Sequence, residues 1–261
     1  MTESEWMTIQ AGTVKAMIEH VAKFSTPISK VIDAKYGQHC GTGSFVETNG
    51  SIFLVTNEHV VKEMEKQPLA YQTNVEGAYL KLNKPVIVEP EPVEFASSEI
   101  PSLLWKNEER EKEAIKIERF AKSHSPVDGE LLFLAGYSGE RSKFVFGELH
   151  SKGTPYLTQE KPFPANEPRG VFEYHFALHY QPDLATSIDG TSSLPDAHGF
   201  SGSLVWNTRR IECLQNDKPW TPESAQVTGI LWAWPSQSSC LLATRVEKLP
   251  LHILAAISTV A

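Results

Sequence analysis

The strongest constraint on the fold of this chain is a β-hairpin pattern that leads directly to a histidine. Residues 41–46 begin with Gly-Thr-Gly and continue as an apolar strand, and Asn49-Gly50 is a dipeptide typical of tight hairpin turns. Residues 51–56, Ser-Ile-Phe-Leu-Val-Thr, then have the composition of the return strand. His59 follows this strand, where a rigid backbone would suit an imidazole that acts as a base.

Short apolar segments bounded by turn residues continue through most of the chain. Further strands are expected at residues 78–82, 85–88, 131–137, 143–147, 171–180, 203–206, 227–234 and 239–243. The sequence contains no internal repeat and no low-complexity tract. Many short strands with turns between them predict an all-β architecture of barrels or sandwiches.

Three segments instead have a helical pattern. We expect an N-terminal helix within residues 6–30, outside the main body, and a charged connecting helix at residues 105–123. Residues 247–261 are apolar enough for a terminal helix packed on the body. The predicted organisation is a helical extension (residues 1–36), a first β unit with the connecting helix (37–125), and a second β unit with the terminal helix (126–261).

Composition limits the classes of partner and the compartment. The net charge of −8 argues against nucleic acid, which requires clustered basic residues, and no apolar run is long enough for a membrane helix. Three cysteines do not form a disulfide framework, and the acidic start lacks the features of a signal peptide. We therefore expect a cytoplasmic protein that binds neither nucleic acid nor membrane.

A candidate nucleophile lies in the pentapeptide Gly-Phe-Ser-Gly-Ser at residues 199–203. Glycines beside Ser201 allow a sharp turn and bring backbone amides close to a reacting carbonyl, while a serine hydroxyl needs a neighbouring base. A histidine base far upstream of the serine is one of the known orders in serine hydrolases. An α/β-hydrolase elbow is disfavoured, because Ser203 stands where that motif needs glycine and only His252 follows the serine.

These ordered blocks together resemble trypsin-like serine peptidases. The resemblance rests on residues 41–46, the Thr-x-x-His-Val pattern within 54–61, residues 132–139, the serine loop at 199–205, and Thr-Gly-Ile-Leu at 228–231. It is closest to the bacterial, disulfide-free branch that includes HtrA-type enzymes, and it covers roughly residues 41–246.

The resemblance implies two six-stranded antiparallel β-barrels with an active site in the cleft between them. It implies hydrolysis of peptide bonds through an acyl-enzyme, with His59 as general base and Ser201 as nucleophile. The backbone amides of Gly199 and Ser201 would form the oxyanion hole. No metal or organic cofactor is implied, and the partner would be a protein or peptide substrate, in some such peptidases one dedicated protein.

The sequence departs from the family pattern at two places. Phe200 replaces the aspartate that, in secreted members, pairs with a newly cut N-terminus, so activation by trimming is not expected. The acid that orients the histidine is also not obvious. Family spacing favours Glu99, with Glu94 as the rival, and Asp128 or no acid also remains open. Lack of an acid would favour an alternative function, a protease-like module that binds protein without cutting it.

Substrate preference rests on three candidate pocket residues. Asp196 lies five residues before Ser201, close to the place of the acid in trypsin-type pockets, although a loop aspartate that caps a turn is the simpler interpretation. Ile230 and Trp232 lie on the strand expected to run beside an extended peptide. Trp232 and Trp234 either narrow the pocket or belong to the core.

Overall fold

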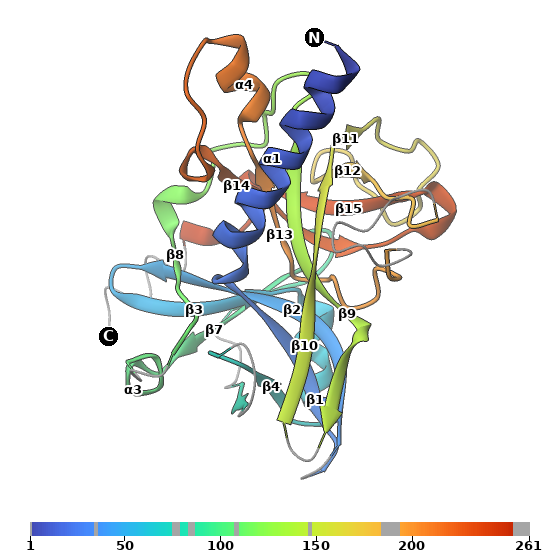
Figure 1. Ribbon diagram of the computed structural model, residues 1–261. Helices are drawn as coiled ribbons and strands as arrows, with labels where there is room; N and C mark the ends of the chain where they lie inside the picture. Colours follow the sequence, from blue (N-terminus) through green and yellow to red (C-terminus); the bar gives the residue numbers. More distant parts are fainter. Residues whose placement is uncertain are drawn as a thin grey trace.

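The computed structural model describes residues 2–33, 36–74, 79–82, 87–106, 110–145, 148–183 and 194–252. Its first half forms one antiparallel sheet and its second half another, and a long N-terminal helix lies across both (Figure 1). The elements of the first half are α1 (Glu3–Ala22), β1 (Ser25–Val31), β2 (Gly37–Thr48), β3 (Ser51–Thr56), α2 (Glu58–Val61), β4 (Leu69–Tyr71), β5 (Leu80–Lys81), β6 (Ile87–Glu89), β7 (Phe95–Ile100), α3 (Ser102–Trp105) and β8 (Ile115–Lys116). Those of the second half are β9 (Leu132–Val145), β10 (Glu148–Thr158), β11 (Glu160–Lys161), β12 (His175–His179), β13 (Leu204–Asn207), α4 (Arg210–Gln215), β14 (Gln226–Ala233) and β15 (Cys240–Arg245). Short 3-10 turns lie at Lys62–Glu65, Ile117–Arg119, Pro222–Ser224, Ser236–Ser238 and Val246–Lys248.

The first sheet is built around the predicted hairpin. Its strand order is β5-β4-β1-β2-β3-β7-β6, and β8 pairs in parallel with β2. The β2–β3 pair runs from Ser44 opposite Val55 to Thr48 opposite Ser51. Asn49 and Gly50 form the turn with φ values of 48° and 82°, the left-handed conformation that this dipeptide adopts easily. The hairpin prediction is therefore confirmed.

The second sheet has the order β10-β9-β13-β14-β15-β12-β11. Its long β9–β10 hairpin extends from the second sheet toward the first, where it contacts β1 and β2 (Figure 1). The catalytic candidates come from connections between strands: His59 follows β3, and Ser201 precedes β13. The architecture of two antiparallel β units is confirmed, although the described residues form sheets of eight and seven strands rather than six each, because two-residue strands such as β5, β8 and β11 add to them.

Three large apolar clusters and a smaller one, which includes Trp232 and Leu242 of the second sheet, form the core of the described residues. Of the large clusters, one fills the first sheet and includes Phe45 and Leu54, and one fills the second and includes Leu134 and Phe200. The third cluster contains Phe53 of β3 together with residues of β9, β13 and β14, so it forms the seam between the sheets. Because these side chains are almost completely removed from water, their burial is the main force that fixes one half against the other.

Helix α1 packs across this seam. Thr2 caps it, since its side chain accepts a hydrogen bond from the Glu5 N–H and its own N–H donates to the Glu5 carboxylate. Thr13, Met17 and Val21, spaced by four residues, form its buried face. Helix α1 contacts β9 and β10, so it is part of the main body rather than an extension outside it.

The helical predictions were less accurate than the strand predictions. Helix α1 ends at Ala22, and Ser25–Val31 is a strand of the first sheet rather than the end of the helix. The connecting helix expected at residues 105–123 is not formed by its described residues. Trp105 is the end of a single helical turn that begins at Ser102, and Ile115 and Lys116 are extended because they pair with Val46 and Glu47 of β2. Of the expected terminal helix, residues 253–261 lie outside the described residues.

Candidate active site

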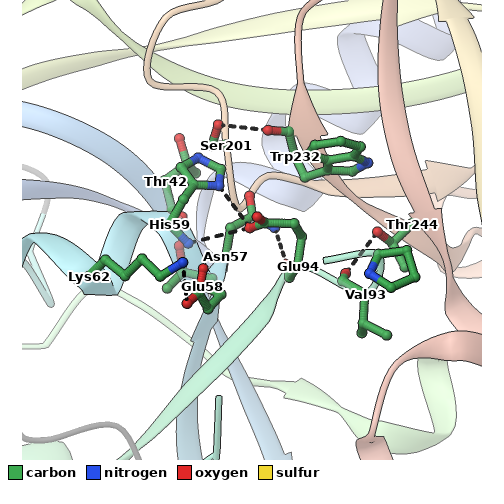
Figure 2. Close-up of polar contacts among 12 residues, drawn as sticks. Thr42, Asn57, Glu58, His59, Lys62, Val93, Glu94, Ser201, Trp232 and Thr244 are labelled. Atoms are coloured by element: carbon green, nitrogen blue, oxygen red, sulfur yellow. Dashed lines mark hydrogen bonds and ion pairs between the residues drawn. The ribbon is translucent and has the colours of Figure 1, made fainter. Parts of the chain in front are cut away.

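His59 is held by a carboxylate, and that carboxylate belongs to Glu94. His59 Nδ1 lies 2.8 Å from Glu94 Oε2, and the backbone N–H of His59 donates to the same oxygen at 3.3 Å. The His59 side chain is 41% exposed, while that of Glu94 is only 5% exposed. The imidazole therefore has one edge fixed against a buried acid and the other edge available to solvent or substrate (Figure 2).

The position of Glu94 follows from a proline-containing turn. The acid turn, residues 90–94, brings the N–H groups of Val93 and Glu94 within hydrogen-bond distance of the Pro90 carbonyl. Glu94 itself has a φ of 53°, which directs its side chain away from the course of β7. Asn57, just before α2, donates a side-chain hydrogen bond to the Glu94 carbonyl. The acid is thus fixed through both its carboxylate and its backbone.

The charge of Glu94 suits a histidine partner. Burial opposes ionisation of this carboxyl, but hydrogen bonds from His59 outweigh it and lower the pKa of Glu94 below its ordinary value. An ionised Glu94 can only accept a hydrogen bond from Nδ1, so in the neutral ring Nδ1 carries the hydrogen. The Nε2 lone pair then faces away from Glu94, as a general base requires.

Glu99, the acid favoured by sequence spacing, lies elsewhere. It is opposite Phe53 in the β3–β7 pair and lines a surface hollow with Trp105 and Lys106. It lies five positions after Glu94 along an extended segment, roughly 16 Å at the usual rise per residue. Asp128 lies in the turn before β9 and lines a different hollow with Gln159 and His179. The structure thus brings Glu94 to His59 and neither Glu99 nor Asp128.

Ser201 lies in the nucleophile loop, residues 199–203, at the seam between the sheets. Gly199 and Gly202 have φ values of +96° and +92°, the conformation that glycine adopts without strain. The Ser201 carbonyl accepts a hydrogen bond from the Thr42 N–H of β2 at 2.8 Å, and its hydroxyl donates to the Trp232 carbonyl at 3.2 Å. In Figure 2 the edge of the His59 ring opposite Glu94 points toward the Ser201 hydroxyl.

The nucleophile loop also presents backbone donors. Within the part of the chain that the structure describes, the N–H groups of Gly199 and Ser201 have no hydrogen-bond partner. The Gly199 carbonyl is turned the other way, because it accepts a hydrogen bond from Thr42 Oγ1 at 2.8 Å. Two unpaired N–H groups beside a serine hydroxyl form the arrangement needed to stabilise a developing oxyanion.

His39 of β2 supports this loop from behind and was not singled out by the sequence. His39 Nε2 lies 2.7 Å from the Tyr137 carbonyl, and a Cβ on Gly199 would come within 2.3 Å of the same nitrogen. Burial lowers the pKa of His39 to about 4, against the opposing effect of its hydrogen bonds to the Tyr137 and Gly199 backbone. His39 is therefore a neutral packing partner of the loop at neutral pH.

The acid turn is supported in return by the second sheet. His175 Nε2 of β12 lies 2.7 Å from the Pro92 carbonyl, and Thr244 Oγ1 of β15 donates to the Val93 carbonyl at 2.9 Å (Figure 2). Each half of the molecule thus holds a site loop of the other half. Sequence reasoning missed this, because pairs such as Thr244 and Val93 lie 151 residues apart in the chain.

The three pocket candidates have different environments. Ile230 is fully buried in the seam cluster, so its side chain does not line a pocket. Trp232 is nearly buried with its ring 4.9 Å from that of His175, and it meets Ser201 through its backbone carbonyl. Asp196 is exposed and lines a hollow of about 370 Å³ with Tyr180 and Trp234.

Metal ligands, membrane-spanning helices and disulfides were also sought among the described residues. In this part of the chain no three His, Cys, Asp or Glu side chains come together as metal ligands would. None of its helices has the length and apolar character needed to cross a bilayer. All three cysteines, Cys40, Cys213 and Cys240, are unpaired.

No protein-family model matches this chain, and no curated protein matches it. Several solved structures match this chain in fold. A scabies mite inactivated protease paralogue matches with a TM-score of 0.54 and 11% identity over 93% of this chain and 97% of the other. The active form of the Rv3671c protease from M. tuberculosis matches with a TM-score of 0.49 and 15% identity, covering 93% and 85%. The serine protease domain of the Sesbania mosaic virus polyprotein matches with a TM-score of 0.46 and 11% identity, covering 88% and 90%.

These likenesses, at such low identity, concern the fold alone. Together with the two antiparallel sheets and their order, the match to the mite protein shows that this chain has a trypsin-like double β-barrel fold. That mite protein is named as an inactivated paralogue, so the fold does not distinguish a peptidase from a protein that has lost catalysis. The distinction depends on the side chains of the site.

Proposed function

We propose that this protein is a serine endopeptidase that hydrolyses a peptide bond of a protein substrate through an acyl-enzyme on Ser201. The observation that carries the proposal is the hydrogen bond of 2.8 Å between His59 and the buried Glu94, on a ring whose opposite edge faces Ser201. A base held in the correct tautomer by an ionised acid is the feature that a merely protease-like fold does not need.

The reaction follows from this arrangement. The Ser201 hydroxyl turns from the Trp232 carbonyl to His59 Nε2, gives up its proton and attacks the scissile carbonyl. Glu94 stabilises the imidazolium that forms, and the N–H groups of Gly199 and Ser201 bind the oxyanion. The imidazolium next protonates the leaving amine. A water molecule, deprotonated by His59, then attacks the acyl carbonyl. The bond to Ser201 Oγ breaks, and His59 returns the proton to this oxygen.

The setting of this activity is part of the proposal. Three unpaired cysteines and the absence of a disulfide among the described residues favour a reducing, cytoplasmic environment. The blocks around His59 and Ser201 favour the bacterial branch that includes HtrA-type enzymes. An extended substrate would lie beside Trp232 at the end of β14, beyond Ile230, the last residue of this strand that pairs with β13, and within reach of the hollow at Asp196. The substrate would be a protein, in the narrowest case one dedicated partner.

A fluorophosphonate probe tests the proposal without knowledge of the substrate. The probe reacts with activated serines, so we expect stoichiometric labelling of the wild type at Ser201, identified by peptide mass spectrometry. Labelling should fall to background in Ser201→Ala and in His59→Ala. Ser203→Ala is the matched control, because Ser203 lies in the same loop but is fully buried, and it should label like the wild type. Cleavage of casein should follow the same order.

The alternative function is a protein-binding module that does not cut. It is favoured by one observation, that the Ser201 hydroxyl is bonded to the Trp232 carbonyl rather than to His59. The test of this alternative is a wild-type protein that is folded and yet resists both the probe and casein cleavage. This result would favour the binding module over the peptidase.

A further inference from the structure

A cavity of about 400 Å³ lies between α1, the β9–β10 hairpin and the segment before β8. Its walls are formed by Ile18, Ala22, Ala135, Tyr137, Gly153 and Pro155. The exposed charged residues Glu19, Glu111 and Lys152 stand around it, and Lys23, which pairs with Glu113, is half-buried there. The cavity thus has apolar walls and a charged rim, and its volume is in the range of small-molecule sites.

One cation is buried within this cavity. Lys112 is only 5% exposed, and its ammonium group donates to the Ala22 carbonyl at 2.8 Å. Among the described residues no carboxylate forms an ion pair with it. Burial lowers the pKa of Lys112 to about 8, with Glu111 acting in the opposite direction, so the group is still mostly charged at neutral pH.

A buried ammonium group with one hydrogen bond is an incomplete arrangement. It has three donors, and a charge removed from water is costly unless an anion compensates it. The usual compensation in proteins is an ion pair with a carboxylate of the same chain. Among the described residues Glu111, which lines the same cavity, raises the pKa of Lys112 but forms no ion pair with it. A ligand with a negatively charged head would supply the ion pair, while its apolar part would cover Ile18, Ala135 and Pro155.

We propose that this cavity is a binding site for a small amphipathic monocarboxylate, such as a medium-chain fatty acid, whose carboxylate pairs with Lys112 and whose chain lies against the wall formed by α1, β9 and β10. The mainly apolar walls disfavour a strongly hydrated phosphate or dicarboxylate, because much of such an anion would lie against surface that offers it no hydrogen bond. A neutral apolar compound would contact the apolar walls but would leave the charge of the Lys112 ammonium group without a counter-ion.

The cavity also adjoins the support of the candidate active site. The ring of Tyr137 lines the cavity, its carbonyl is bonded to His39, and its N–H donates to Thr42 Oγ1 at 3.0 Å. Thr42 and His39 both contact Gly199 of the nucleophile loop. A ligand that restricts Tyr137 would therefore also restrict the loop that carries Ser201. This consequence rests on the proposed function, whereas binding itself does not.

Calorimetric titration of the full chain with decanoate and with decanol tests the binding site. We expect decanoate to bind the wild type at pH 7 and to bind Lys112→Met roughly 10- to 100-fold more weakly, the usual loss of a hydrogen bond between charged groups. Lys152→Met, which removes an exposed lysine of the rim, should change the affinity less than twofold. Decanol should not distinguish the wild type from Lys112→Met. Absence of decanoate binding, or equal affinity of both proteins for it, overturns the proposal.

A second measurement does not depend on the folding of a variant. Raising the pH from 7 to 9.5 removes the proton of Lys112 in the wild type, so decanoate should bind more weakly while decanol is unaffected. An unchanged decanoate affinity across this range contradicts the role of Lys112.

The coupling to the loop is measured with the fluorophosphonate probe. Saturating decanoate should raise the rate of Ser201 labelling at least twofold in the wild type and leave the rate in Lys112→Met unchanged, because a preordered loop loses less entropy in the reaction. Binding without any labelling in either condition would refute the peptidase and keep the ligand site. Binding with normal labelling at an unchanged rate would refute only the coupling.

Discussion

The acid turn and the nucleophile loop reach the same site from opposite sheets, and they are held in different ways. The acid turn is fixed by side chains that donate to it, from Asn57 of its own half and from His175 and Thr244 of the other. The nucleophile loop is fixed mainly by its backbone, through two left-handed glycines and close contacts with β2. One is a network of separable hydrogen bonds, and the other is a tightly packed turn.

This difference predicts how each region fails. A network loses one bond at a time, and each neutral bond contributes about 1 kcal/mol to stability. A packed turn has no room for an added atom, so a single methyl group displaces the whole loop. We therefore expect the rates of hydrolysis and of labelling to depend most on the charge of Glu94 and on the backbone N–H groups beside Ser201.

The largest effect is expected from Glu94→Gln. The substitution keeps the shape of the side chain but removes the charge that selects the tautomer of His59, a loss of about 10⁴ in kcat for comparable sites. Hydrolysis rates of casein or of a fluorogenic peptide, measured at pH 7, provide the readout. Glu99→Gln is the matched control and should retain at least half of the activity, because Glu99 lies on the far part of β7. A larger loss in Glu99→Gln than in Glu94→Gln would remove Glu94 from the site.

The identity of this acid also shows what sequence reasoning can and cannot reach. The hairpin could be predicted, and His59 and Ser201 could be named as candidates, because local strand and turn signals surround them. Spacing from His59 selected Glu99, because counting residues assumes a regular path through the segment. The Pro90 turn and the left-handed Glu94 bring the earlier glutamate to the site, and only its position just before the apolar start of β7 hinted at this.

Tertiary contacts also explain the errors outside the site. Residues 105–123 carry a charge pattern typical of a helix, yet Ile115 and Lys116 join β2 and Lys112 is buried under α1. Local propensity was overruled there by pairing with a distant strand. No local sequence pattern could predict the contacts that support the site, because they join positions far apart in the chain. These are the contacts of His39, Thr42, His175 and Thr244.

The second largest effect is expected from Gly202→Ala. A Cβ on Gly202 would lie 1.9 Å from the Thr42 carbonyl oxygen, a backbone atom, and the residue has a φ of +92°. Displacement of the loop would remove the oxyanion donors, so we expect the rate of fluorophosphonate labelling to fall by about 10²- to 10³-fold. Gly139→Ala is the control, because no atom lies within 4 Å of a Cβ built there. Similar labelling by both variants would mean that the loop is not tightly packed.

A third effect concerns His39, which packs against the nucleophile loop. The pKa of His39 is lowered from 6.5 to about 4 in the folded protein, chiefly by burial. Because the unfolded chain binds this proton more readily, stability is lost as the pH falls from about 6.5 to 4, by up to about 3 kcal/mol. Urea unfolding at pH 7, 5.5 and 4.5 should show a smaller acid loss in His39→Gln than in the wild type. Parallel losses in the two proteins would show that His39 does not titrate in this way.

The smallest effects, on the free energy of unfolding, are expected from substitution of Thr42 or Thr244, the two threonines that join the halves. Thr244→Val removes one hydrogen bond to the acid turn, so we expect a loss of about 1 kcal/mol in the free energy of unfolding. Thr42→Val leaves both the Gly199 carbonyl and the Tyr137 N–H without their partner, so the loss should be about 2 kcal/mol or more. Both side chains are fully buried and valine has nearly the same shape, so the two values are directly comparable. Equal losses in urea unfolding would mean that the two regions are held alike, because the difference between a separable bond and a packed loop would then have no energetic consequence.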